Sequence, residues 1–234
     1  MDDEKYFTFA GHNMPGNAGY YSNNKQTCPE SVRFAGKPLY PKKILVWVAI
    51  SERGLSKVLI RPSQSAAINS DIYISECLQK RLIPFLHKYH TDLNYIFWPD
   101  LASAHYAKVT VDWMTHNIYF VPKAINPPKV PVARPIENFW GCLAQKVYKG
   151  GWEATTEEQL MRRIETKIKE FDADFCQSLM SGVRTKLRKI ADEGTFFMLQ
   201  TMIFNTSIKA LKVTKKMYLY LVTSERYLVE KLVS

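Results

Sequence analysis

The sequence lacks three patterns that would place it in a common class of protein. No apolar run approaches the ~20 residues that a bilayer-spanning helix needs, so we expect no membrane association. The first residues, Met-Asp-Asp-Glu-Lys, are too polar for a secretory signal. None of the cysteines forms a C-x-x-C pair, and all four lie far apart: Cys28, Cys77, Cys142 and Cys176. We therefore expect reduced thiols rather than a zinc site or disulfide framework, and a cytoplasmic or nuclear protein.

Charge is the unusual feature of the composition. The chain has 32 Lys and Arg against 22 Asp and Glu, a formal net charge of +10. A basic excess of this size favours a polyanionic partner, most often nucleic acid. The length of 234 residues, 46% of them hydrophobic, is enough for one large globular domain.

The apolar pattern predicts alternating strands and helices. Strands are expected at 3–9, 42–51, 55–61, 95–98 and 118–122. Helices are expected from Asn69 or Ser70 to Tyr89 with a kink at Pro84, over 103–116, from Pro135 to Gly150, after a capping box Thr155-x-x-Glu158, and from Phe175 to Ile190. The run 42–51 is almost continuously apolar, which is typical of a central strand covered on both faces. This order predicts an α/β fold with a mixed sheet flanked by helices.

Two segments differ from this pattern. Residues 10–43 are rich in Gly, Pro, Asn, Ser and Lys, and we expect a long loop excursion. Residues 195–234 contain no Gly or Pro and only a poor helical pattern, so we expect a poorly anchored tail. The predicted domain is therefore 1–194.

Three acidic residues stand at element ends where a catalytic site could form. Asp3 opens the first strand, Asp100 ends the apolar run that starts at Tyr95, and Glu137 lies in the first turn of a helix begun by Pro135. Carboxylates gathered in one cleft repel one another unless a cation lies between them. Two Mg²⁺ or Mn²⁺ ions held by such oxygen ligands would support phosphodiester chemistry. The alternative is that Glu137 only interacts with the helix dipole.

The same residues carry a resemblance. The segments 3–7 (Asp-Glu-Lys-Tyr-Phe), 98–107 (Trp-Pro-Asp-Leu-Ala-Ser-Ala-His-Tyr-Ala) and 134–140 (Arg-Pro-Ile-Glu-Asn-Phe-Trp) resemble the three catalytic blocks of mariner-superfamily transposases. Those blocks run roughly D-E-x-x-F, D-N-A-x-x-H and N-P-I-E-x-x-W. The resemblance covers about residues 2–192. It implies an RNase H-like fold, two divalent metal ions, hydrolysis at transposon ends, and joining of the freed 3′-hydroxyl to target DNA.

Block matching implies the triad Asp3, Asp100 and Glu137 as catalytic residues and metal ligands. Asp2 is the runner-up for the first position, but the family's Asp directly precedes Glu, which selects Asp3. The resemblance places His105 beside the phosphate or a metal ligand, and Asn138 beside Glu137. A helix histidine making one structural hydrogen bond is the alternative for His105.

The chain departs from the family in three places. Thirty-six residues separate Asp100 from Glu137, slightly more than is usual in the family. Leu101 replaces the Asn that normally follows the second Asp, which removes a polar group near the metals. Family members carry helix-turn-helix domains that recognise transposon ends, and none fits ahead of Asp3. We therefore expect a catalytic domain without its DNA-reading domain, or a degraded copy.

Other residues allow two interpretations. The basic residues Arg184, Lys186, Arg188 and Lys189 suit DNA phosphates, although a solvated charged face is commoner. Trp140 is expected in the core rather than stacked on a base. The family reaches across to a dimer partner through the region of 10–43, so a homodimer is possible here too.

The leading hypothesis is a nuclear transposase core that cuts and joins DNA with Mg²⁺ or Mn²⁺. A non-catalytic DNA-binding protein that keeps the fold is the main alternative. A nuclease acting on RNA–DNA hybrids is a third, because a fold does not determine function.

Overall fold

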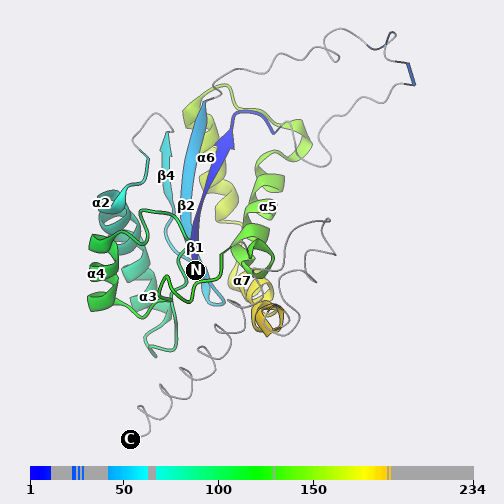
Figure 1. The fold of residues 1–234 in the computed structure, drawn as a ribbon. Helices are drawn as coiled ribbons and strands as arrows, with labels where there is room; N and C mark the ends of the chain where they lie inside the picture. The colour runs from blue at the N-terminus through cyan, green and yellow to red at the C-terminus, as the bar shows by residue number, and fades with distance from the viewer. Residues whose placement is uncertain are drawn as a thin grey trace, which may run out of the picture.

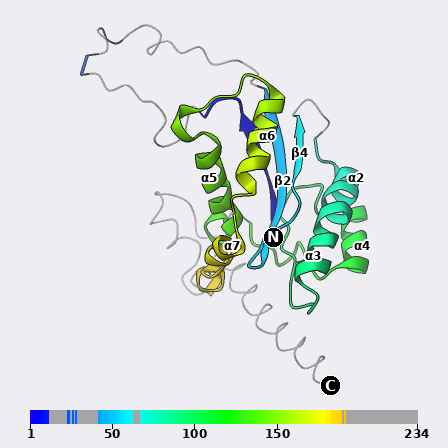
Figure 2. The same ribbon diagram turned by 180° about the vertical axis from the view of Figure 1, so that it is seen from behind.

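The computed structural model describes residues 1–11, 23–24, 26, 28, 42–62, 67–128, 130–188 and 190. The strands are β1 (Asp2–Thr8), β2 (Lys43–Ser51), β3 (Gly54–Leu55) and β4 (Leu59–Pro62). One face of this sheet is covered by α2 (Ser70–Ile72), the π-helix η1 (Tyr73–Leu82), α3 (Ile83–Tyr89) and α4 (Lys108–Asn117). The other face is covered by α5 (Pro135–Val147), α6 (Glu157–Ile168) and α7 (Ala173–Met180) (Figures 1 and 2). Two short 3-10 helices, η2 (Pro131–Ala133) and η3 (Lys149–Gly151), flank α5.

β2 is the central strand, as its apolar sequence predicts. β1 and β4 both pair with it antiparallel, so that Trp47 lies between Glu4 on one side and Leu59 on the other. Every residue from 44 to 50 is buried. Because side chains alternate along a strand, successive β2 residues enter different cores, and both cores need apolar partners.

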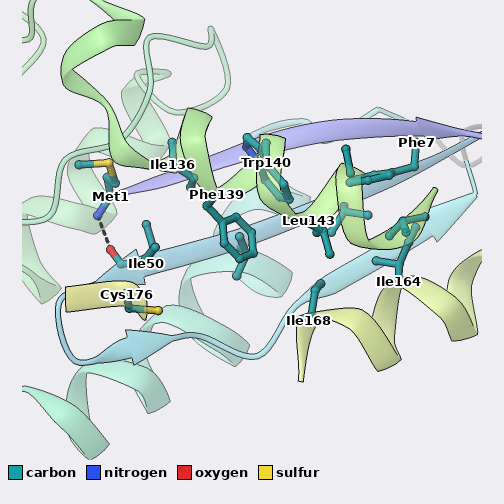
Figure 3. Close-up of a cluster of buried hydrophobic side chains, with 14 of the residues drawn as sticks. Met1, Phe7, Ile50, Ile136, Phe139, Trp140, Leu143, Ile164, Ile168 and Cys176 are labelled. Atoms are coloured by element: carbon teal, nitrogen blue, oxygen red, sulfur yellow. Dashed lines mark hydrogen bonds between the residues drawn. The ribbon is translucent and has the colours of Figure 1, made fainter. Parts of the chain in front are cut away.

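The two cores lie on opposite faces of the sheet. Trp47 and Ala49 pack among residues of η1, α3 and α4. The other core joins β1 and β2 to α5, α6 and α7; Figure 3 shows Phe7 on β1 facing Trp140 and Leu143 on α5, with Ile164 and Ile168 on α6 below them. Each large apolar side chain buried in this way contributes roughly 1.5–3 kcal/mol. The apolar stripe of α5 is fully buried and fixes α5 against β1; it consists of Ile136, Phe139, Trp140, Leu143 and Val147.

The helical segment after Asn69 differs from the prediction. Asn69 caps it, since its side chain accepts a hydrogen bond from the Ile72 backbone N–H at 2.9 Å. The next ten residues, however, are π-helical rather than α-helical. Pro84 lies in the first turn of α3, where a residue without an N–H is tolerated. Tyr73, the first residue of the π-helix, is fully buried and contacts two residues of the site described below, Asp2 and His105.

The predicted strands 95–98 and 118–122 are reduced to one parallel bridge between Phe97 and Phe120. The Phe97 N–H donates to Tyr119 O, and the Val121 N–H donates to Phe97 O, both at 2.8 Å. Pro99 and Pro122 come directly after these bonds, and a proline has no N–H with which to extend a ladder.

The predicted helix 103–116 begins later, at Lys108. Residues before it form turns, because the Asp100 carboxylate accepts from the Ala102 N–H at 2.8 Å and so bends the chain locally. Thr110 Oγ1 also donates to Ala104 O at 2.7 Å, which ties the turns to α4.

The caps of the later helices are close to the predictions. α5 begins at Pro135, and Gly150 and Gly151 follow its end with φ of 72° each. The N-cap of α6 is Thr156, one residue after the predicted Thr155. The Thr156 side chain accepts a hydrogen bond from the Gln159 N–H, and the Gln159 side chain accepts one from the Thr155 N–H.

The last predicted helix is interrupted. α7 ends at Met180, and residues 183–188 are helical again. Most of the predicted 10–43 excursion and all of the predicted 195–234 tail lie outside the described residues. No helix in the described part of the chain is both long and apolar enough to cross a membrane.

Candidate active site

The three acids predicted as metal ligands lie on three different elements. Asp3 is the second residue of β1 and pairs with Val48 of the central strand. Asp100 follows the Phe97 bridge and the Pro99 that ends it. Glu137 is exposed in the first turn of α5. The N-terminal end of β1 lies near the start of α5 (Figure 1), and the interactions below join both to Asp100.

Asp3 interacts with both other acids and with α5. Trp140 Nε1 donates a hydrogen bond to Asp3 Oδ2 at 2.8 Å. The pKa of the Asp3 carboxyl is raised to about 7, chiefly because burial disfavours its charged form. Repulsion from the Asp100 and Glu137 carboxylates raises this pKa too, whereas the Trp140 bond lowers it. Asp3 therefore lies close enough to both other acids for their charges to act on it.

Asp100 is balanced by a neighbouring cation. Burial alone would raise its pKa, but pairing with His105 outweighs burial and holds the pKa below its usual range. His105 Nδ1 lies 2.5 Å from Asp100 Oδ1, and the Ala102 N–H binds that same oxygen. These contacts orient the carboxylate through Oδ1 and leave Oδ2 as the oxygen that could ligate an ion.

His105 is fully buried between two carboxylates. Its Nε2 lies 3.1 Å from Glu4 Oε1, so the ring joins Glu4 on β1 to Asp100. Burial lowers the pKa of His105, but Asp100 and Glu4 more than reverse this and raise it to about 10. The ring also stacks on Tyr73, with centroids 3.8 Å apart. His105 is thus an imidazolium that holds two segments together.

Asp2, the runner-up for the first position, has different surroundings. It is fully buried, and its Oδ2 accepts hydrogen bonds from Trp47 Nε1 at 3.0 Å and Tyr73 OH at 2.6 Å. Both donors belong to the core opposite the one that contains Trp140. Since consecutive strand residues face opposite sides, Asp2 and Asp3 cannot both point toward α5.

The described residues contain no group of three His, Cys, Asp or Glu side chains already gathered closely enough to hold a metal ion. The donor types nevertheless fit Mg²⁺ or Mn²⁺, because these cations prefer oxygen ligands and keep several waters. Burial and two like charges raise the pKa of the Asp3 carboxyl, and such a raised pKa indicates a site that lacks positive charge.

The remaining predicted residues lie on α5 and on the helical stretch after α7. Asn138 is exposed on α5. Arg184 and Arg188 are exposed and Lys186 is half-buried on the helical stretch after α7, while Lys189 lies outside the described residues.

Sequence reasoning missed three parts of the site. Glu4 is a partner of His105, Trp140 is a hydrogen-bond donor to Asp3 as well as a core residue, and Arg134 binds backbone next to two of the acids. The spacing of Trp140 three residues after Glu137 places both on neighbouring positions of one helix face, which is a sequence signal for its role beside the block that ends in Trp.

Comparison with known proteins gives relatives over most of the chain. No protein-family model matches it. The transposable element Tc3 transposase of Caenorhabditis elegans is 28% identical over 194 residues, which cover 81% of this chain and 54% of that protein. The chain therefore spans about half the length of the curated relative it matches.

Solved structures of Mos1 transposase share the fold. The paired-end complex with the left transposon end has a TM-score of 0.64 at 18% identity and covers 83% of this chain and 55% of that chain. The Mos1 catalytic domain alone has a TM-score of 0.56 at 15% identity, with 82% and 80% covered. Mos1 paired-end complexes with Mg and with Mn give TM-scores of 0.64 and 0.60, both at 16% identity, and cover 82% of this chain and 54% of theirs.

The isolated Mos1 domain is covered far more completely than the longer Mos1 chains, so the shared part is the catalytic domain, a mixed sheet with flanking helices of the RNase H type. The resemblance of the three sequence blocks and the likeness of the fold agree. The chain is a homologue of the Tc1/mariner transposases over their catalytic domain.

Proposed function

We propose that this chain is a DDE-type transposase catalytic core that cleaves DNA strands and joins the freed 3′-ends to target DNA. The observation that carries the proposal is that contacts join the three segments with the predicted acids: Trp140 of α5 donates to Asp3 at 2.8 Å, and His105 joins Asp100 to Glu4 on β1. Structural homology to a transposase catalytic domain supports the same reaction.

Asp3, Asp100 and Glu137 would hold two Mg²⁺ or Mn²⁺ ions, the metals with which Mos1 paired-end complexes are known. Bound there, such ions supply activation of the attacking oxygen and stabilisation of the leaving oxygen in phosphoryl transfer. Glu137 is exposed, so its side chain has the freedom to turn toward the other two acids once a cation offsets their repulsion.

The surrounding residues would keep the ligands in place. Trp140 fixes one oxygen of Asp3, and His105 with the Ala102 N–H fixes one oxygen of Asp100. Ligands held by packed neighbours reorganise little during the reaction, which is where much of the rate enhancement arises.

The partner of this site would be DNA. The net charge of +10 favours a polyanion, and Mos1 forms paired-end complexes with transposon DNA. Arg184, Lys186 and Arg188 are candidates for phosphate contacts on the helical stretch after α7. We further propose a homodimer in the nucleus, where paired ends could be held together.

The test is nicking of supercoiled plasmid with Mg²⁺ or Mn²⁺. Asp100→Ala and Glu137→Ala should each lower the nicking rate at least 100-fold, because each removes a metal ligand. Asp112→Ala, which changes an exposed acid on α4, is the matched control and should nick like wild type. Equal nicking by all four proteins would exclude the proposed site and indicate a contaminating nuclease.

A second candidate is a non-catalytic DNA-binding protein with this fold. It is favoured by the finding that the acids of the described residues are not gathered tightly enough to chelate an ion as they stand. DNA binding that depends on salt but not on metal, without nicking, would identify this function. Preference for RNA–DNA hybrids over duplex DNA in the nicking assay would instead indicate a hybrid-specific nuclease.

A further inference from the structure

Arg134 lies immediately before α5 and contacts both other segments that carry a predicted ligand. Its Nη2 donates a hydrogen bond to Asp2 O at 2.9 Å, and its Nη1 donates to Pro99 O at 3.3 Å. Asp2 and Pro99 are the residues directly before Asp3 and Asp100. Arg134 itself lies three residues before Glu137. The Arg134 guanidinium therefore links the start of α5, to which it belongs, to the two segments that carry Asp3 and Asp100.

The Asp2 carbonyl is available because of the register of β1. Met1 and Ile50 exchange both backbone hydrogen bonds, from Ile50 N to Met1 O at 2.8 Å and from Met1 N to Ile50 O at 3.0 Å. In an antiparallel pair the next residues, Asp2 and Ala49, then form a non-hydrogen-bonded pair. The Asp2 carbonyl consequently faces the free edge of β1, away from β2.

Arg134 bridges a gap in the backbone pairing. None of the backbone hydrogen bonds of the described residues joins β1 to residues 95–100. The two forked donors of Arg134 span this gap, which a planar guanidinium does and a single amino group cannot.

The side chain of Arg134 is itself held in position. Its guanidinium carbon lies 5.2 Å from the centre of the Trp98 ring, within the range of a cation–π contact. Asn126 accepts a hydrogen bond from Trp98 Nε1 at 2.7 Å and donates one to Pro99 O at 2.9 Å. The ring that Arg134 covers and the carbonyl that it binds are thus fixed by one buried amide.

We infer that Arg134 is a positioning residue for the metal-binding acids: its fork sets the spacing of Asp3 and Asp100 relative to the start of α5. This inference rests on the proposed function. The catalytic block that segment 134–140 resembles has Asn at this position, so the resemblance assigns Arg134 no role. Its contribution to the reaction would be indirect, through the geometry of the ligands.

The test compares Arg134→Lys and Arg134→Gln with a matched control, Arg163→Lys. Arg163 makes the same kinds of contact elsewhere, since its Nε donates to Val147 O at 2.6 Å and its guanidinium lies 4.3 Å from the Trp152 ring centre. Thermal unfolding identifies variants that fail to fold. Titration calorimetry with Mn²⁺ and plasmid nicking then measure affinity and turnover on the folded ones.

Arg134→Lys should weaken Mn²⁺ binding about 10-fold and slow nicking by at least as much, because Lys keeps the charge but not the fork. Arg163→Lys should change both by less than about twofold at a similar loss of thermal stability. Wild-type Mn²⁺ affinity and nicking in Arg134→Lys would overturn the inference, as would equal losses in the Arg163 control.

A metal-free measurement separates this inference from the proposed function. Hydrogen–deuterium exchange of the backbone amides at 2–5 and 97–102 should be at least 10-fold faster in Arg134→Lys than in wild type without any metal. Wild-type protein that binds no Mn²⁺ would refute the proposed function, and unchanged exchange in the variant would refute the positioning role of Arg134.

Discussion

The carboxyls of Asp3 and Asp100 have opposite electrostatic environments although they belong to the same site. Burial and like charges raise the pKa of Asp3 to about 7. The His105 imidazolium outweighs burial at Asp100 and keeps that pKa low. At neutral pH Asp100 is therefore charged, whereas Asp3 is near its midpoint and gains most from an added cation.

The raised pKa of Asp3 predicts how stability depends on pH. The folded protein holds the Asp3 proton up to about pH 7, whereas the unfolded chain releases it near the ordinary value of 3.8. Because the folded state binds more protons in this window, stability falls as the pH rises from about 4 to about 7. In EDTA, Asp3→Asn should be more stable than wild type at pH 8 by up to about 4 kcal/mol, the free energy that corresponds to a pKa shift from 3.8 to about 7.

Thermal unfolding of both proteins at pH 4 and pH 8 measures this difference. The advantage of Asp3→Asn should vanish at pH 4, and Asp112→Asn should behave like wild type at both values. An advantage that is the same at both pH values would show that the Asp3 carboxyl titrates normally.

His105 predicts a loss of stability in the same direction, with rising pH, but at higher pH values than Asp3. Its pKa is raised to about 10, so its stabilising charge is fully present below about pH 6.5 and is lost as the pH rises through about 10. His105→Gln should destabilise the protein by about 3 kcal/mol at pH 6.5, because Glu4 and Asp100 then face each other without a cation.

Urea unfolding at pH 6.5 and pH 10 measures the His105 effect. His87→Gln, on the exposed side of α3, is the control and should change stability by less than about 0.5 kcal/mol. A cost for His105→Gln that does not shrink toward pH 10 would mean that His105 acts through packing on Tyr73 and not through its charge.

Among the elements, α5 links the core to the site. Its buried apolar residues pack on β1 (Figure 3). Trp140, one of these residues, donates to Asp3, and Glu137 lies in the first turn of the same helix. Packing of α5 therefore sets where two of the three acids lie.

Trp140→Phe separates these two roles of α5. Phe keeps most of the buried ring but removes the N–H that binds Asp3, so the expected loss is about 1–2 kcal/mol, against about 3–5 kcal/mol for Trp140→Ala. Denaturant unfolding measures both values, with Trp113→Phe on α4 as the control for ring size. Equal losses for Trp140→Phe and Trp140→Ala would mean that the hydrogen bond, and not the packing, dominates.

The elements that the sequence predicts well are those decided by local pattern. β2 shows a continuous apolar run because both faces are covered, and α5 carries a regular stripe between Pro135 and two glycines. Strand 95–98 fails because β-prone residues need a partner strand, and the prolines after it stop the ladder. The π-helical register of Tyr73–Leu82 has no local signal, since spacings of three and four also fit an α-helix.

In the site, too, some features can be predicted from local sequence and others depend on tertiary contacts. The positions of Asp3, Asp100 and Glu137 come from blocks of adjacent residues, and their assignment as ligands stays a prediction. The bonds of Arg134 to Asp2 and Pro99 and of His105 to Glu4 depend on tertiary contacts between segments far apart in the chain. No single segment of sequence contains that information.

At the scale of the whole molecule, the chain has a fold similar to that of the Mos1 catalytic domain, a net charge of +10, and a match that spans about half the length of the Tc3 relative. Cleavage and joining of DNA would need this domain to bind divalent ions before anything else. Ion binding therefore tests the account more directly than an assay that also depends on DNA recognition.

The decisive measurement is titration calorimetry of Mn²⁺ binding at pH 8, without DNA, on wild type and on Asp3→Asn, Asp100→Asn and Glu137→Gln. Wild type and the surface control Asp112→Asn should bind Mn²⁺ alike, and each of the three site variants should bind at least 10-fold more weakly, since each removes one carboxylate ligand. Failure of wild type to bind Mn²⁺, or equal binding by all five proteins, would contradict a metal site formed by Asp3, Asp100 and Glu137.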